Sequence, residues 1–295
     1  MTDLKLLGMG AALGSAASWA VGSILFKRIG ETVTPFGMTL SKGAVSSLLL
    51  GAVLCVTGYG AIPGGALGLL LVSGILGIAV GDTLFFAALQ DLGPVGLIVF
   101  FMAGQILTAL LAILFLGEVP GPGEWTGIGV VLAGIAMVLL TQISRDQTHR
   151  PTRMRGILLG FFSMLAMSLS LIIAKQALGS VSTMTATFIR MVAGTLGMLL
   201  FGMLTGRVRE WLNPFSDMNM LGVFVISVCV VTFGGFWLSL VAIKHVEIAI
   251  ANALSAAEPL FVIPLAVIFL KERVTLMEIA GAVLTVFGVI LLCRV

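Results

Sequence analysis

The chain has 295 residues, of which 59% are hydrophobic and 10% are charged, and it carries a net charge of +3. Soluble domains carry about 25% charged residues, so this composition excludes an ordinary soluble protein and predicts an integral membrane protein. The basic residues gather at the ends of apolar runs, where they orient membrane helices, rather than in a basic stretch interleaved with aromatic residues. We therefore expect no nucleic-acid partner, and we predict a multi-pass protein of the cell (inner or plasma) membrane, surrounded by the lipid bilayer.

Apolar segments long enough to cross a bilayer follow one another along the chain. A span needs about 20 apolar residues, and cutting the chain at clusters of charge, glycine and proline gives about ten of them. They cover residues 4–28, 35–57, 64–90, 94–117, 122–142, 154–177, 182–205, 218–243, 247–270 and 275–293. We therefore predict an all-α integral membrane fold with about ten transmembrane helices.

A single polar linker, residues 144–155, falls almost at the centre of the chain. It predicts one five-helix repeat over residues 1–143 and a second over residues 156–295. Because five is an odd number, the second repeat would cross the membrane in the opposite direction to the first. Such inverted-topology repeats are typical of secondary transporters, whose substrate site lies near the midplane where the repeats meet.

The two halves also share residues at fixed spacing. An offset of 154 pairs Glu118 with Glu272, and it continues into the next helix by pairing Gly134 with Gly288. Polar and glycine matches are harder to attribute to chance than matches between apolar residues. They support the prediction of a repeat.

These motifs resemble the drug/metabolite transporter superfamily, in particular its ten-helix EamA-type family. The resemblance rests on "FLGE" (115–118) and "FLKE" (269–272), each closing the fourth helix of its half, and on "AEP" (257–259). A basic residue early in the second helix of each half, Lys42 and Arg190, also fits at an offset of 148. The resemblance covers essentially the whole chain and is more specific for the fold than for the substrate.

The resemblance implies a transporter with a cavity lined by helices one, three, four, six, eight and nine. On these helices it places Trp19, Gln105 and Trp237 as candidate wall residues. It also implies termini in the cytoplasm. The distribution of Lys and Arg favours the reverse orientation, and the two alternatives stay open.

Charged residues at helix ends have an ordinary structural interpretation. Lys27, Lys175, Glu118 and Glu272 all lie where a predicted helix ends. Because long charged side chains at such positions reach the interface, we expect these four to extend toward water.

Four charged residues, Lys42, Asp82, Arg190 and Glu258, lie deeper in the spans. Lys42 and Asp82 are each roughly 10–12 Å from the same membrane face at 1.5 Å per residue, so they can pair as a structural salt bridge, a gate or a substrate contact. Asp82 maps onto Phe236 at an offset of 154, so Arg190 lacks an equivalent partner. Arg190 is then either near the interface or paired elsewhere, and Glu258 is the only acid at a comparable depth.

Glu258 is the strongest candidate for a functional residue. A carboxylate near the middle of a span is costly, and ionisable residues there are functional candidates by default. Pro259 beside it cannot donate a helical hydrogen bond, so the helix can kink and expose a carbonyl to a cavity. On a continuous helix, Asn252 and Ser255 would share one face with Glu258. Glu258 could then bind a cationic group or carry a proton.

We therefore predict a secondary active transporter, in particular an exporter of small metabolites, amino-acid-like compounds or drugs, working by alternating access around a midplane cavity. Its partners would be a small-molecule substrate and either protons or a counter-substrate, and the chain would be a monomer or a homodimer. The two histidines, His149 and His245, fall in predicted loops, so we expect no enzyme activity, catalytic residue, metal or cofactor. The alternative is a non-transporting membrane scaffold or a component of a lipid or lipid-precursor flippase.

Overall fold

The computed structural model of the protein describes residues 2–30, 32–145, 153–255, 257, 258, 260, 261 and 275–294. Regular structure in these residues is helical. Before the linker lie α1 (Thr2–Ile29), α2 (Pro35–Thr57), α3 (Gly64–Gly74), the π-helix η1 (Ile75–Asp82), α4 (Thr83–Leu116) and α5 (Pro122–Arg145). After it lie α6 (Arg153–Ala177), α7 (Thr183–Thr205), α8 (Val208–Leu212), the 3₁₀-helix η2 (Asn213–Ser216), α9 (Met218–Cys229), the π-helix η3 (Val230–Trp237), α10 (Leu238–His245), α11 (Ile248–Ser255) and α13 (Leu276–Arg294).

Six segments of the described chain are long and apolar enough to cross a membrane. They are Asp3–Gly22, Pro35–Thr57, Gly64–Asp91, Met154–Ala177, Thr183–Thr205 and Met218–His245. These segments coincide with the first, second, third, sixth, seventh and eighth predicted spans, which confirms an all-α multi-pass membrane protein. The other four spans, and with them the count of ten, stay predictions.

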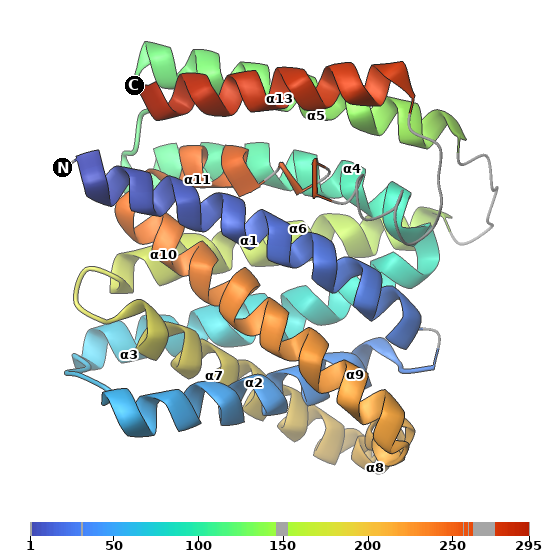
Figure 1. Ribbon diagram of the computed structural model, residues 1–295. Helices are drawn as coiled ribbons and strands as arrows, with labels where there is room; N and C mark the ends of the chain where they lie inside the picture. The colour runs from blue at the N-terminus through green and yellow to red at the C-terminus, as the bar shows by residue number, and fades with distance from the viewer. Residues whose placement is uncertain are drawn as a thin grey trace.

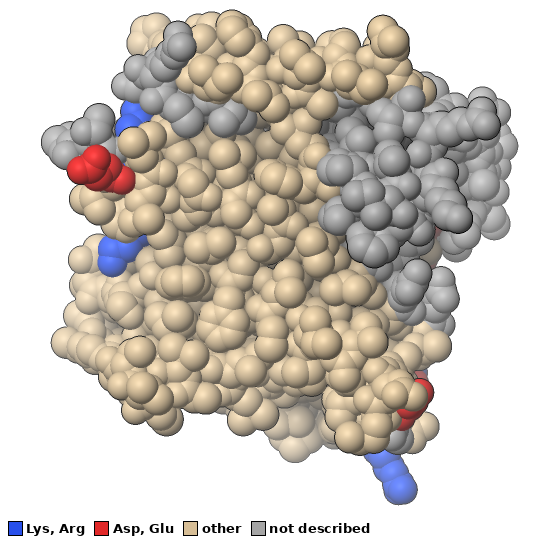
Figure 2. Space-filling model, in the orientation of Figure 1, with Lys and Arg blue, Asp and Glu red and all other residues tan. Residues whose placement is uncertain are grey.

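Large apolar side chains lie on the outer surface, as a membrane protein requires. Examples are Leu48 (75% exposed), Leu204 (79%) and Val283 (65%). Figure 2 shows the charged residues of the described surface near the two ends of the helices, with an uncharged band between them. A band of this kind is suited to face the bilayer, because exposing so much continuous apolar area to water would be unfavourable.

Helices of the two halves interlock. The two second helices, α2 and α7, pack against each other, and so do α5 and α13. In addition α1 packs against η3, α10 and α11, while α6 packs against α3, η1 and α4. In Figure 1, α1 runs away from the face where both termini lie and α6 runs toward it, which is the relation that inverted repeats require. The boundaries at residues 143 and 156 stay predictions.

Gly134 and Gly288, which the offset of 154 pairs between the two halves, have equivalent surroundings. A Cβ atom on Gly134 would lie 2.6 Å from the backbone nitrogen of Thr285, and one on Gly288 would lie 2.6 Å from the backbone nitrogen of Val131. Each glycine therefore lets its own helix approach the backbone of the other fifth helix. This symmetric contact fits the register that the sequence predicts.

The third span of each half contains a π-helical segment of eight residues. Aligning η1 with η3 gives an offset of 155, which places Trp237 at the position equivalent to Asp82. The sequence offset of 154 places Phe236 at that position instead, so the two alignments differ by one residue, which is within the precision of helix boundaries. π-helical turns occur often at functional sites, and here both end at candidate site residues.

Candidate functional site

An ion pair lies deep in the first half of the protein. Lys42 of α2 pairs with Asp82 at the end of η1, and the two side chains are only 1% and 3% exposed. The ammonium group also lies 4.5 Å from the ring centroid of Phe236 and 5.6 Å from that of Phe86. The predicted pairing of Lys42 with Asp82 is thus confirmed, and two aromatic faces add favourable contacts to the cation.

Arg190 of α7 lies beside this pair. Its side chain is buried, its Nη2 donates a hydrogen bond to Ser170 Oγ at 3.0 Å, and its Nε has no hydrogen-bond partner. Its charged neighbour is Asp82. Of the two alternatives that the sequence left open, the structure favours the second: Arg190 is buried rather than at the interface, and its charged neighbour is Asp82 rather than Glu258. One carboxylate thus faces two cations, one from each half.

Ser170 belongs to a contact that the sequence did not reveal. Its hydroxyl donates to the carbonyl of Ser73 at 2.7 Å, and the hydroxyl of Ser73 donates to the carbonyl of Ser170 at 2.7 Å. A Cβ on Gly77 would lie 2.2 Å from Ser170 Oγ, and one on Gly74 would lie 2.4 Å from the carbonyl oxygen of Arg190. Small residues on η1 and α3 therefore allow α6 and α7 to approach closely.

The second candidate region follows α11. This helix ends at Ser255, and the next bonds are short-range: Ala257 N–H donates to Leu254 at 3.1 Å, and Leu260 N–H donates to Ala257 at 2.9 Å. The regular helix therefore stops before Glu258. The predicted polar face of Asn252, Ser255 and Glu258 on one continuous helix is wrong, because that face requires unbroken helical spacing. Pro259 lies outside the described residues.

Polar groups around this break lack partners. Asn252 is 7% exposed, and its Nδ2 has no hydrogen-bond partner. Ser255 and Glu258 are half-buried. Among the described residues, the carboxylate of Glu258 has neither a hydrogen bond nor a charged neighbour. Within the described part of the chain, an acid and an amide without partners therefore lie six residues apart.

The three candidate wall residues differ in their surroundings. Trp19 of α1 contacts Phe236 edge to face, with 5.0 Å between ring centroids. Trp237 Nε1 donates to Thr183 Oγ1 at 3.1 Å. The side chain of Gln105 lies outside the described part of the structure. Trp19 therefore reaches the Lys42–Asp82 pair through Phe236, whereas Trp237 bonds to the start of α7.

Two of the helix-end charges form a contact that the sequence did not predict. Lys175 and Glu118 pair with each other, with side chains 18% and 17% exposed, and their extension toward water stays a prediction. The side chain of Lys27 and the whole of Glu272 lie outside the described residues. In the part of the chain that is described, no group of His, Cys, Asp and Glu has the arrangement of a metal site.

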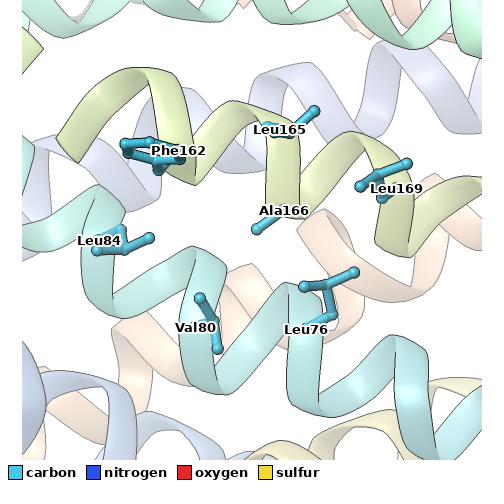
Figure 3. A pocket seen from close by; sticks show the side chains of 7 residues that line it. All are labelled: Leu76, Val80, Leu84, Phe162, Leu165, Ala166 and Leu169. Atoms are coloured by element: carbon cyan, nitrogen blue, oxygen red, sulfur yellow. The ribbon is translucent and has the colours of Figure 1, made fainter. Parts of the chain in front are cut away.

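A groove between the two halves is wholly apolar. Its walls are Leu76, Val80, Leu84, Phe162, Leu165, Ala166 and Leu169. Figure 3 shows these side chains directed into the space between η1 with the start of α4 on one side and α6 on the other. Because none of them can bind a polar group, the groove fits a hydrocarbon chain of the bilayer better than a metabolite.

The described features define a multi-pass membrane protein with buried charges where its two halves meet. The chain matches the EamA-like transporter family over residues 6–140 and again over 154–294. It therefore belongs to that family, whose members are transporters, and it contains two copies of the family repeat.

Two further proteins are similar to this chain. An uncharacterized transporter, YwfM of Bacillus subtilis (strain 168), is 26% identical over 137 residues, which is 46% of this chain and 46% of that protein. The match thus spans about half the length of that relative. A solved crystal structure shares the fold with a TM-score of 0.72 at 19% identity, over 98% of this chain and 97% of the other.

Proposed function

We propose that the protein is a secondary active exporter of small metabolites, amino-acid-like compounds or drugs in the inner or plasma membrane, with Glu258 as its central binding residue. One observation carries the proposal: the Glu258 carboxylate has no ionic partner among the described residues, although it follows a helix break within the predicted ninth span. A structural carboxylate at this depth would be expected to have a partner.

Asn252 supports the same proposal. Its buried amide nitrogen is a hydrogen-bond donor without a partner, and a buried donor left unpaired costs about 1–3 kcal/mol. A substrate that accepts this hydrogen bond and offers a cation to Glu258 would satisfy both groups. Ser255 and Gln105 stay proposed members of this site, as does Pro259.

The Lys42–Asp82–Arg190 group forms the second part of the proposed pathway. Lys42 and Asp82 belong to the first half and Arg190 to the second, so a relative movement of the halves changes the distance between Asp82 and Arg190 while the Lys42–Asp82 pair stays together. We propose that this group responds to alternating access, with Trp19 and Trp237 on adjacent walls. Protons or a counter-substrate would supply the driving force.

The proposal is tested by a ligand screen based on thermal stability, followed by a transport assay. Purified wild-type protein and the Glu258→Gln variant are heated with a panel of amino acids, amines and nucleosides, because a ligand that binds only the folded state raises the Tm. Compounds that stabilise the wild type alone are then tested in proteoliposomes under a pH gradient. If the variant is stabilised as much as the wild type and shows equal, pH-dependent uptake, Glu258 is not part of the binding site.

The alternative of a lipid-flippase component makes a different prediction. Its specific support is the apolar groove of Figure 3, which lies between the halves and fits a hydrocarbon chain. Val80→Trp and Ala166→Trp would fill this groove without altering Glu258. Loss of lipid scrambling in liposomes with these two variants would favour the alternative, whereas intact metabolite transport with both would favour the exporter.

A further inference from the structure

A cluster of charges lies at the face of the protein that carries both termini, which we term the terminal-face cluster. Lys5 lies near the start of α1, Glu118 between α4 and α5, Glu124 in the first turn of α5, Lys175 in the last turn of α6, and Glu247 between α10 and α11. Five of the helices concerned, α1, α4, α6, α10 and α11, belong to spans that the family resemblance places around the cavity. The cluster therefore joins cavity-lining helices of both halves.

One ion pair in this cluster holds the start of α11. Lys175 pairs with one oxygen of Glu118 and also donates to the carbonyl of Val246 at 3.1 Å. The other oxygen of Glu118 accepts the backbone N–H of Ile248 at 2.8 Å. An ammonium group from the second half and a carboxylate from the first thereby fix the first residue of α11 against α4 and α6.

A second ion pair supports the linker that carries Glu118. Lys5 Nζ lies 2.9 Å from Glu124 Oε1, and Glu124 Oε2 accepts the N–H of Gly121 at 2.9 Å. This contact connects α1 to α5 and orders the segment that follows Glu118. Because most of these charged groups are half-buried, salt screens them less than it screens pairs on an open surface.

Apolar side chains close the space next to these charges. Ala12 of α1, Ala112 of α4, Ala174 of α6, Leu240 of α10 and Ile248 of α11 belong to one hydrophobic cluster, and each is fully buried. Three of the five are alanines, so each loses little buried apolar area when the helices separate. The terminal face is therefore closed in this structure by contacts of small side chains.

The geometry points to Glu118 and Lys175 as the positioning pair of a gate at the terminal face. While they are paired, the start of α11 is held against α4 and against Lys175 of α6, and the described helices pack closely at this face. When they separate, α11 can move away and open a path. A substrate path to this face rests on the proposed function, but the movement of α11 is measurable without a substrate.

The test measures the distance between the two halves at this face. Spin labels are attached to Val119→Cys, which follows α4, and to Lys244→Cys, at the end of α10 just before α11; both are exposed positions outside the cluster, and Cys55, Cys229 and Cys293 are first replaced by serine. Distances are recorded by pulsed electron paramagnetic resonance in lipid nanodiscs. Glu118→Gln and Lys175→Gln should each raise the ratio of long to short distances roughly three- to fivefold, as expected for loss of one ion pair.

A charge exchange distinguishes the effect of the Glu118–Lys175 ion pair from the effect of the hydrogen bond that Glu118 accepts from the Ile248 N–H. The double variant Glu118→Lys with Lys175→Glu restores the ion pair but cannot accept the Ile248 N–H, and it should return the distances toward the parent. Glu210→Gln, which breaks the exposed Arg207–Glu210 pair, is the matched control and should change nothing. If Glu118→Gln does not accumulate, Lys175→Gln, which keeps the cap on Ile248, decides the question.

Two results would overturn the inference. One is an unchanged distance distribution in both neutral variants, and the other is a charge exchange that remains as open as the single variants. The proposed function fails separately: if Glu258→Gln still binds and transports like the wild type, Glu258 is not the site. The distance change in Glu118→Gln would then still establish the gate.

Discussion

Lys42 of α2 and Asp82 of η1 form a buried ion pair, and the side chain of Arg190 from the other half lies close to the same carboxylate. Counted as ionised groups, these three residues carry one net positive charge away from water. Burying a charged group away from water costs free energy, and the attraction between opposite charges offsets this cost only while both partners are present. Removing different members of the group should therefore have unequal effects.

Asp82→Asn should destabilise the protein more than Lys42→Met does. The first change leaves two buried cations without a carboxylate, whereas the second leaves Asp82 with Arg190. Breaking a buried pair costs about 3–5 kcal/mol, and we expect Asp82→Asn to lie at the upper end. Thermal unfolding of the purified variants in one detergent gives the order. The prediction fails if Lys42→Met is the less stable of the two.

Gly77→Ala should destabilise the protein because the new methyl group has no space. A Cβ there would lie 2.2 Å from Ser170 Oγ and 3.4 Å from Nη2 of Arg190. Overpacking of this kind costs about 1–3 kcal/mol. Gly68→Ala, in the same span but with nothing within 4 Å of its Cβ, is the matched control. It should be neutral or stabilising by about 0.5–1 kcal/mol, since alanine favours a helix. Equal melting temperatures for the two variants would contradict the close approach.

The sequence predicts the helix ends well because the residues that end helices are local. The second span was predicted to begin at Pro35, and the structure adds the cap of Thr34, whose hydroxyl accepts the N–H of Gly37 at 3.2 Å. The pairing of Lys42 with Asp82 was also predictable from depth, because both lie in apolar surroundings at similar distances from one face. In these cases spacing along the chain carried enough information.

Contacts between distant helices could not be predicted in the same way. Glu118 and Lys175 each look like an ordinary helix-end charge, and only the arrangement of the halves brings them together. The absence of an acid at Gly104, the position equivalent to Glu258, has a spatial reason as well. A Cβ at Gly104 would lie 2.7 Å from Met164 Sδ of α6, so a larger side chain fits there only if the methionine moves.

Glu247 should make the stability of the protein depend on pH. Burial, together with the carboxylates of Glu124 and Glu118, raises the pKa of Glu247 above its ordinary value, while Lys175 and Lys5 lower it. A raised carboxylate pKa means that the folded state binds the proton more tightly than the unfolded state does. Stability from this group is therefore greatest below the ordinary carboxylate pKa and falls as pH rises through the raised value.

Glu247→Gln removes this dependence. We expect the variant to have a higher Tm than the wild type at about pH 7.5, and the same Tm at about pH 4, where Glu247 is protonated in both states. His245 lies two residues earlier and is the other ionisable side chain on this short segment besides Lys244, so His245→Gln is the control and should not abolish the difference. A Glu247→Gln effect that is equal at both pH values would show that charge is not its cause.

The two oxygens of Glu118 should contribute separately to stability. Glu118→Gln loses the ion pair with Lys175 but keeps an oxygen that can accept the Ile248 N–H, whereas Glu118→Ala loses both contacts. The alanine variant should therefore be less stable than the glutamine variant by about 1 kcal/mol, the usual net contribution of one hydrogen bond. At exposed Glu210, where the carboxylate bonds to Arg207, the same two substitutions should differ by less than about 0.5 kcal/mol. Indistinguishable unfolding of the two Glu118 variants would mean that the bond to Ile248 adds no stability to the start of α11.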